Sequence, residues 1–263
     1  FGSTATMGHL GVAVSAIGSS SVSRQNGWPG GTNGGNVSAA ASFYDLVMID
    51  SGGRTGIGQL TFSMYLDAQG NGLNTASPIV DANGTSLAGV GDDVRATLNV
   101  AGQTFVNQAG YSSNLSVNSQ GLSTNSTSAY SLVNGLAAPD ILGYYTYTVP
   151  FTFGSEFVLG MSLMLSAYAS ALGNAAASIS VDATHSFDWA GIQGVTVDGA
   201  PIAFSLTSAS GTDWRISMAP PIGSPVLAVP EPATYALVLV GIAALVLQER
   251  RRHWSRLAHQ TST

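Results

Sequence analysis

The chain has 263 residues, of which only 8% are charged, and it contains neither lysine nor cysteine. Without cysteine, disulfides, thiolate metal sites and cysteine nucleophiles are excluded. Residues 1–228 carry four arginines against twelve acidic side chains, a net charge of −8. No basic patch can therefore neutralise the phosphates of a nucleic acid. Hydrophobic residues make up 45% of the chain, which is enough to bury a core.

The first 226 residues are long enough for one large all-β domain. The first strand is expected near residues 10–17 and is followed by a glycine-rich loop that contains Trp28. Residues 39–49 and 58–67 are expected to be neighbouring strands. In the second of them apolar and polar residues alternate with a period of two, which is typical of a half-buried strand; the apolar positions are Leu60, Phe62, Met64 and Leu66.

A long polar connection is expected over residues 67–93. Its run Asp67, Gln69, Asn71 copies the first half of a calcium loop, but Pro78 stands where an EF-hand needs a bidentate carboxylate. An EF-hand is therefore excluded. Two interpretations remain: an ordinary loop of Asx turns, or an irregular Ca²⁺ site, with no other cofactor expected. The candidate calcium ligands are Asp67, Asn71, Asp81, Asp92 and Asp93.

The remaining β segments are residues 94–106, 141–153, 156–169, 174–187 and the two halves of 194–208. Turns are expected at Ala101–Gly102 and Asp198–Gly199. We expect residues 156–169 to form the central strand and residues 112–130 to form short strands at most. Eight to eleven short strands without a sustained helical period predict a β-sandwich of jelly-roll-like architecture over residues 1–226.

The histidines give little support to an enzyme. His185 precedes Asp188, but no G-x-S-x-G motif is present to place a serine nucleophile beside them. Glu156 is the one glutamate before the C-terminal segment, and no pair of carboxylates stands out as a glycosidase pair. We therefore expect no enzymatic activity.

The tryptophans Trp28, Trp189 and Trp214 leave two interpretations open. Aromatic rings of a sandwich usually pack in its core or anchor a loop, as a scaffold requires. The alternative is that these three rings stack on sugars, which would make the domain a surface carbohydrate-binding module, with Ca²⁺ as a stabilising ion.

Residues 229–252 read VPEPATYALVLVGIAALVLQERRR and have three parts. Pro230 and Pro232 fix their φ angles and remove two backbone donors, so residues 227–232 are expected to be an extended linker. Residues 233–247 carry no charge and give roughly 22 Å of helix, short against a hydrocarbon core of about 30 Å. A buried core helix is the alternative for so short a run. The flanking prolines and arginines favour a transmembrane helix over residues 233–249.

Half of the eight basic residues follow this apolar run, among them Arg250, Arg251 and Arg252. The positive-inside rule then places residues 250–263 in the cytoplasm and the bulk of the chain across the membrane. The arginines act as the membrane stop.

This order of motif, apolar span and basic stop resembles the PEP-CTERM sorting tail of exosortase substrates in Gram-negative bacteria. The resemblance implies that Pro230, Glu231 and Pro232 form the sorting signal, read by an exosortase after transient anchoring in the inner membrane. It also implies a cell-surface or extracellular-matrix protein associated with exopolysaccharide and biofilm. Residues 144–214 resemble, more loosely, the C-terminal half of ectodomains in this family.

Overall fold

The computed structural model describes residues 1–20, 33–67, 69–76, 85–118, 120–139, 141–172 and 175–220. The chain divides into two compact units, residues 1–219 and residues 220–263. The description below concerns the first unit. The predicted linker, helix and basic tail (residues 227–263) lie outside the described residues.

The described residues form fourteen strands. In chain order they are β1 (Gly2–Thr6), β2 (His9–Ser20), β3 (Asn33–Asp50), β4 (Ile57–Leu66), β5 (Gln69–Ala76), β6 (Thr85–Val100), β7 (Gln103–Asn118), β8 (Ser123–Val133), β9 (Leu136–Ala137), β10 (Gly143–Thr152), β11 (Glu156–Leu172), β12 (Ala175–Val197), β13 (Ala200–Pro201) and β14 (Ser205–Ser208).

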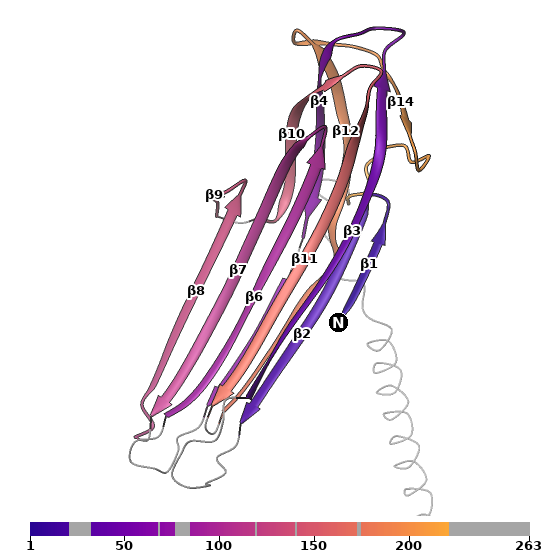
Figure 1. The fold of residues 1–263 in the computed structure, drawn as a ribbon. Coiled ribbons are helices and arrows are strands. Elements are labelled where there is room, and N and C mark those ends of the chain that lie inside the picture. Colours follow the sequence, from indigo (N-terminus) through magenta and orange to yellow (C-terminus); the bar gives the residue numbers. More distant parts are fainter. Residues whose placement is uncertain are drawn as a thin grey trace, which may run out of the picture. The chain divides into compact units, whose positions relative to one another are not determined.

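The strands build two antiparallel seven-stranded sheets (Figure 1). Sheet A has the order β1-β2-β12-β4-β10, and β5 and β13 pair with β12 as well. Sheet B has the order β14-β3-β11-β6-β7-β8-β9. The chain passes repeatedly from one sheet to the other, since β2, β4, β10 and β12 belong to sheet A and β3, β11 and β6 to sheet B. The prediction of an all-β fold in two layers is confirmed.

Alternation of side chains produces the core between the sheets. In β11 the inward residues Leu159, Met161, Leu163 and Leu165 are at most 1% exposed. Strand β11 pairs with β3 on one side and β6 on the other along nearly its whole length. Residues 156–169 are therefore a central strand, as predicted.

The core changes character along the strands. At one end, aromatic rings fill the space between the sheets, as in the stack of Phe105 on Tyr147 with ring centroids 4.0 Å apart. At the other end the buried positions are mostly alanines, among them Ala16, Ala169 and Ala177. Small side chains allow the two sheets to approach closely there.

Two predicted turns are confirmed. Ala101 and Gly102 join β6 to β7 with φ of 49° and 78°, and Asp198 and Gly199 join β12 to β13 with φ of 50° and 80°. Two positive φ values in a two-residue loop are typical of the type I′ hairpin turn, whose twist matches that of the strands.

Four other predictions were wrong. Residues 39–49 and 58–67 are not neighbouring strands, since β3 belongs to sheet B and β4 to sheet A. The strands are not short, since β12 spans 23 residues. Residues 112–130 do not form short strands at most, because β7 runs to Asn118 and β8 begins at Ser123. The supposed connection over residues 67–93 likewise contains β5 and the start of β6. Cross-strand pairing overrode the weak β propensity of serine, asparagine and glycine in these segments.

Candidate functional site

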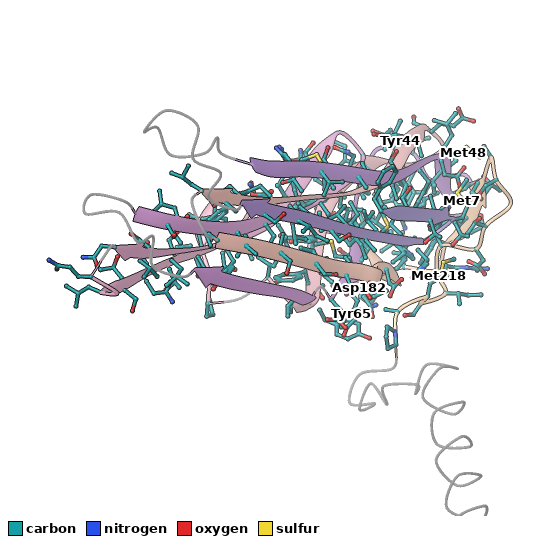
Figure 2. The ribbon with its side chains drawn as sticks, turned by 90° about the horizontal axis from the view of Figure 1, so that it is seen from below. Met7, Tyr44, Met48, Tyr65, Asp182 and Met218 are labelled. Atoms are coloured by element: carbon teal, nitrogen blue, oxygen red, sulfur yellow. The ribbon has the colours of Figure 1, made fainter. Side chains whose placement is uncertain are left out.

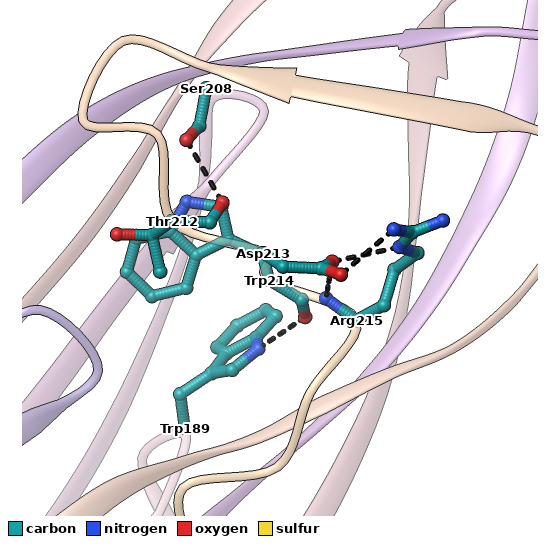
Figure 3. A network of polar contacts seen from close by, with 6 residues as sticks. All are labelled: Trp189, Ser208, Thr212, Asp213, Trp214 and Arg215. Atoms are coloured by element: carbon teal, nitrogen blue, oxygen red, sulfur yellow. Dashed lines mark hydrogen bonds and ion pairs between the residues drawn. The ribbon is translucent and has the colours of Figure 1, made fainter.

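Trp189 and Trp214 join the last described segment of the chain to the sandwich (Figure 3). Trp189 projects inward from β12, and its Nε1 donates a hydrogen bond to the Trp214 carbonyl oxygen at 2.7 Å. The two indoles meet edge to face with centroids 5.7 Å apart. Trp189 also stacks on Phe62 and Trp214 on Phe43, so rings of both sheets surround this junction.

Asp45 is the polar centre of the same junction. It occupies an inward position of β3 and is 5% exposed. Its Oδ2 accepts hydrogen bonds from Trp214 Nε1 at 2.7 Å and from Ser210 Oγ at 2.6 Å, and its Oδ1 accepts one from the Ser210 backbone N–H at 3.0 Å. Burial alone would raise the pKa of Asp45, but these hydrogen bonds outweigh it and hold the pKa below its usual value.

This lowered pKa predicts that acid weakens the sandwich. Because the folded-state pKa of Asp45 lies below the unfolded value of about 3.9, its contribution to stability is present above that pH. The contribution is lost as the pH falls through the folded-state pKa. Urea titrations between pH 6 and pH 3 should show this loss, and Asp45→Asn should remove that part of it. The control Asp198→Asn, at an exposed turn, should keep the full pH dependence; if it behaved like Asp45→Asn, this role of Asp45 would be contradicted.

The two tryptophans in the described part of the chain lie away from solvent. Trp189 and Trp214 are both 0% exposed, so neither ring presents a face on which a sugar could stack. Trp28 lies outside the described residues. The rings that the sequence offered for sugar stacking are, where described, part of the core.

Three of the five candidate calcium ligands lie in the described part of the chain with their side chains: Asp92 and Asp93 on β6, and Asp67 directly after β4. Asp81 and the side chain of Asn71 lie outside the described residues. Asp92 accepts a hydrogen bond from the Tyr111 backbone N–H at 3.1 Å, and Asp93 accepts one from Gln108 Nε2 at 2.9 Å. In the described part of the chain, no group of three or more histidine, aspartate or glutamate side chains could hold a metal ion.

The sequence did not predict one pair of a histidine and an aspartate. His9 of β2 and Asp188 of β12 stand opposite each other in register, and His9 Nδ1 contacts Asp188 Oδ1. Both point to the outer face of sheet A, as does Tyr65, whose ring lies 4.8 Å from that of Tyr144. Burial, and to a lesser degree Asp67, Tyr144 and Asp188, raise the pKa of Tyr65. The pairing depends on β2 lying beside β12, which no local motif reveals.

The His9–Asp188 pair links β2 to β12 beside residues 209–219, which follow β14 and pass close to Trp189 and Gly191. We call residues 209–219 the crossing segment. The Trp189 backbone N–H donates to the Gly8 carbonyl oxygen and the Met218 N–H donates to the Trp189 carbonyl oxygen, both at 2.8 Å. Figure 2 shows Met7 and Met218 at this end of the sheets. The Asp188 side chain is 5% exposed and the His9 side chain 30%, and the pair links β12 to β2.

The residues of the predicted sorting tail cannot be placed. Pro230, Glu231 and Pro232, together with Arg250, Arg251 and Arg252, lie outside the described residues. No helix with the length and apolarity needed to cross a membrane occurs in the described part of the chain.

Comparisons with known proteins add no relative. No protein-family model matches the chain, and the searches of curated proteins and of solved structures also gave no match. The class of protein defined by the fold is a two-sheet, antiparallel all-β domain.

Proposed function

We propose that this chain is an exported, non-enzymatic surface or extracellular-matrix protein that an exosortase sorts through its C-terminal tail. The order of the tail carries the proposal: the Pro230-Glu231-Pro232 motif, then an uncharged span, then three arginines at 250–252. The span over residues 233–249 anchors the protein transiently in the inner membrane. Residues 250–263 stay in the cytoplasm, and processing near the motif sends the ectodomain to the surface.

The ectodomain suits this role. Its fold is jelly-roll-like, as the pairing orders β2-β12-β4-β10 and β3-β11-β6-β7 support, because the early strands β2, β3 and β4 each lie beside one of the late strands β10, β11 and β12. It is cysteine-free and weakly charged, so its stability comes from the long inter-sheet core rather than from disulfides. Exopolysaccharide is the partner that a matrix protein of this kind would meet.

The sorting motif can be tested in the native host. Replacing Pro230, Glu231 and Pro232 together by alanine should leave the chain in the inner membrane at full length, and the surface fraction should lose nearly all of it. Immunoblots of fractionated cells measure both pools. The double variant Pro221→Ala with Pro225→Ala removes two prolines outside the motif and should be sorted normally. Normal surface delivery of the triple variant would refute the proposal.

A surface carbohydrate-binding module remains the second candidate. The burial of Trp189 and Trp214 removes those two rings from it. A different set of exposed rings, on the outer face of sheet B, favours it instead.

A further inference from the structure

Three tyrosines on the outer face of sheet B each lie across a glycine of the neighbouring strand. A Cβ built on any of these glycines would lie only 2.3–2.5 Å from the nearest ring carbon, so the ring occupies the space above the glycine. A side chain at the glycine would displace the ring from the sheet. The pairs, opposite each other in register, are Tyr44 with Gly160, Tyr168 with Gly91, and Tyr130 with Gly110. We call Tyr44, Tyr130 and Tyr168 the tyrosine face.

These rings remain accessible. Tyr44 is 60% exposed, Tyr130 44% and Tyr168 38%. Since one side of each ring rests on the backbone of the adjacent strand, the exposed area belongs to the side turned to solvent. Figure 2 shows Tyr44 on the face of the sandwich opposite to Tyr65 and Asp182. The tyrosine face is therefore formed by the outer surface of sheet B alone.

Polar contacts fix one of the rings. The Tyr130 hydroxyl donates a hydrogen bond to Asp93 Oδ2, and Gln108 Nε2 donates to the same carboxylate oxygen at 2.9 Å and to the Tyr130 Oη at 3.0 Å. The glycines beneath Tyr130 and Tyr168 are diagonal neighbours on β7 and β6, a separation of about 7–8 Å. Two held rings beside a carboxylate and an amide need little reordering to bind a ligand.

The chemistry around the rings is neutral and rich in hydroxyls. On the outer face of β6, Asp93 and Arg95 are two residues apart and offset each other in charge. The neighbouring outward positions are occupied mostly by serine, threonine and asparagine, together with the exposed Leu46, Leu87 and Met164. Ser112 Oγ and Ser128 Oγ are hydrogen-bonded at 2.7 Å. Such a face suits an uncharged ligand that carries hydroxyls and has an apolar side to lay on a ring.

We propose that the tyrosine face binds a neutral polysaccharide, with pyranose rings stacked on Tyr168 and Tyr130 and hydroxyls bonded to Asp93 and Gln108. Gly160 and Tyr168 are eight residues apart on β11, so Tyr44 lies roughly 26 Å along the strand. A polymer can contact both ends, whereas a disaccharide cannot. Glycan binding at this face is inferred from the structure alone. Only the inference that the glycan belongs to the surrounding matrix rests on the proposed function.

A second copy of the chain fits this face less well. The buried centre of a homodimer interface is apolar, whereas the exposed Met164 between Tyr44 and Tyr168 is flanked on the same face by Ser162 and Ser166. An acidic polysaccharide fits less well too, because the net charge of residues 1–228 is −8.

The test is affinity electrophoresis of the full chain in a polyoxyethylene detergent, which has no sugar headgroup to compete. Gels contain a β-glucan, a galactomannan, dextran or polygalacturonate. We expect retardation by at least one neutral polysaccharide, weakened about tenfold by Tyr168→Ala or Tyr130→Ala. Tyr168→Phe should bind as the native chain does. Tyr168→Leu, which still covers Gly91 without an aromatic ring, should bind as weakly as the alanine variant. Tyr111→Ala is the matched control, since Tyr111 is 40% exposed but faces the opposite way.

Several results would overturn the proposal. They are absence of retardation by every neutral polysaccharide, retardation by polygalacturonate alone, or equal weakening by Tyr111→Ala. Sedimentation that shows a dimer broken by Tyr168→Ala would assign the face to a second copy instead. Cell fractionation of Tyr168→Ala separates this proposal from sorting, since the variant should reach the surface normally even where glycan binding is lost.

Discussion

Replacing Trp214 by alanine is expected to lower the free energy of unfolding by about 3–5 kcal/mol, as for other fully buried large aromatic residues. The change removes the ring between Phe43 and Trp189 and also the N–H that reaches Asp45. The Asp45 carboxylate would then be buried with one strong donor fewer, which adds to the cost of the cavity. Urea denaturation followed by circular dichroism measures the difference.

Two further variants separate the contributions at Trp214. Trp214→Phe keeps most of the ring but loses the hydrogen bond to Asp45, so its loss of stability should be intermediate. Arg215→Ala changes the next residue, an exposed side chain paired with Asp213, and should leave the stability nearly unchanged. A Trp214→Ala variant as stable as Arg215→Ala would show that this ring does not hold the crossing segment (residues 209–219) against the sandwich.

Gly191→Ala is expected to destabilise the same junction by about 2–4 kcal/mol. Gly191 has φ of +91°, which side chains rarely adopt. A Cβ there would also lie 2.9 Å from the Arg215 carbonyl oxygen and 3.2 Å from the Ser217 nitrogen. Both contacts are backbone atoms of the crossing segment, so the segment itself would have to move.

Gly194→Ala provides the matched control for Gly191→Ala. It lies on the same strand, has no positive φ, and a Cβ built there meets nothing within 4 Å. Thermal unfolding should therefore separate the two variants by several degrees. Equal melting temperatures would mean that the segment does not press on β12 at Gly191.

Alternation of apolar residues was sufficient to predict individual strands of this fold, but not which sheet each strand joins, since β3 and β4 lie in different sheets. The pattern in residues 58–67 and 156–169 identified β4 and β11 and their buried faces. The lengths of β7 and β8 could not be predicted, because serine and asparagine have low β propensity and only the neighbouring strands make these segments extended. Paired hydroxyl-rich strands resemble loops when each is considered alone.

The contacts around Asp45 and around the tyrosine face could not be predicted either, because their partners are distant in the sequence. The parity of β3 places Asp45 on the inward face, so a buried carboxylate in need of donors was predictable, but its partner Trp214 is 169 residues away. The tyrosine face depends on register in the same way. Tyr168 and Gly91 belong to different strands, and the ring position follows from the alignment of β11 with β6. Burial of the tryptophans was equally invisible, since stacking and core rings have the same sequence pattern.

The most direct test of the sorting mechanism is to recover the protein from the surface of the native host and to measure the mass of its C-terminal peptide. A peptide that ends close to Glu231, together with an ectodomain lacking residues 233–263, is the result expected of an anchor that is cleaved on export. Recovery of surface protein that still carries Arg250, Arg251 and Arg252 would contradict it.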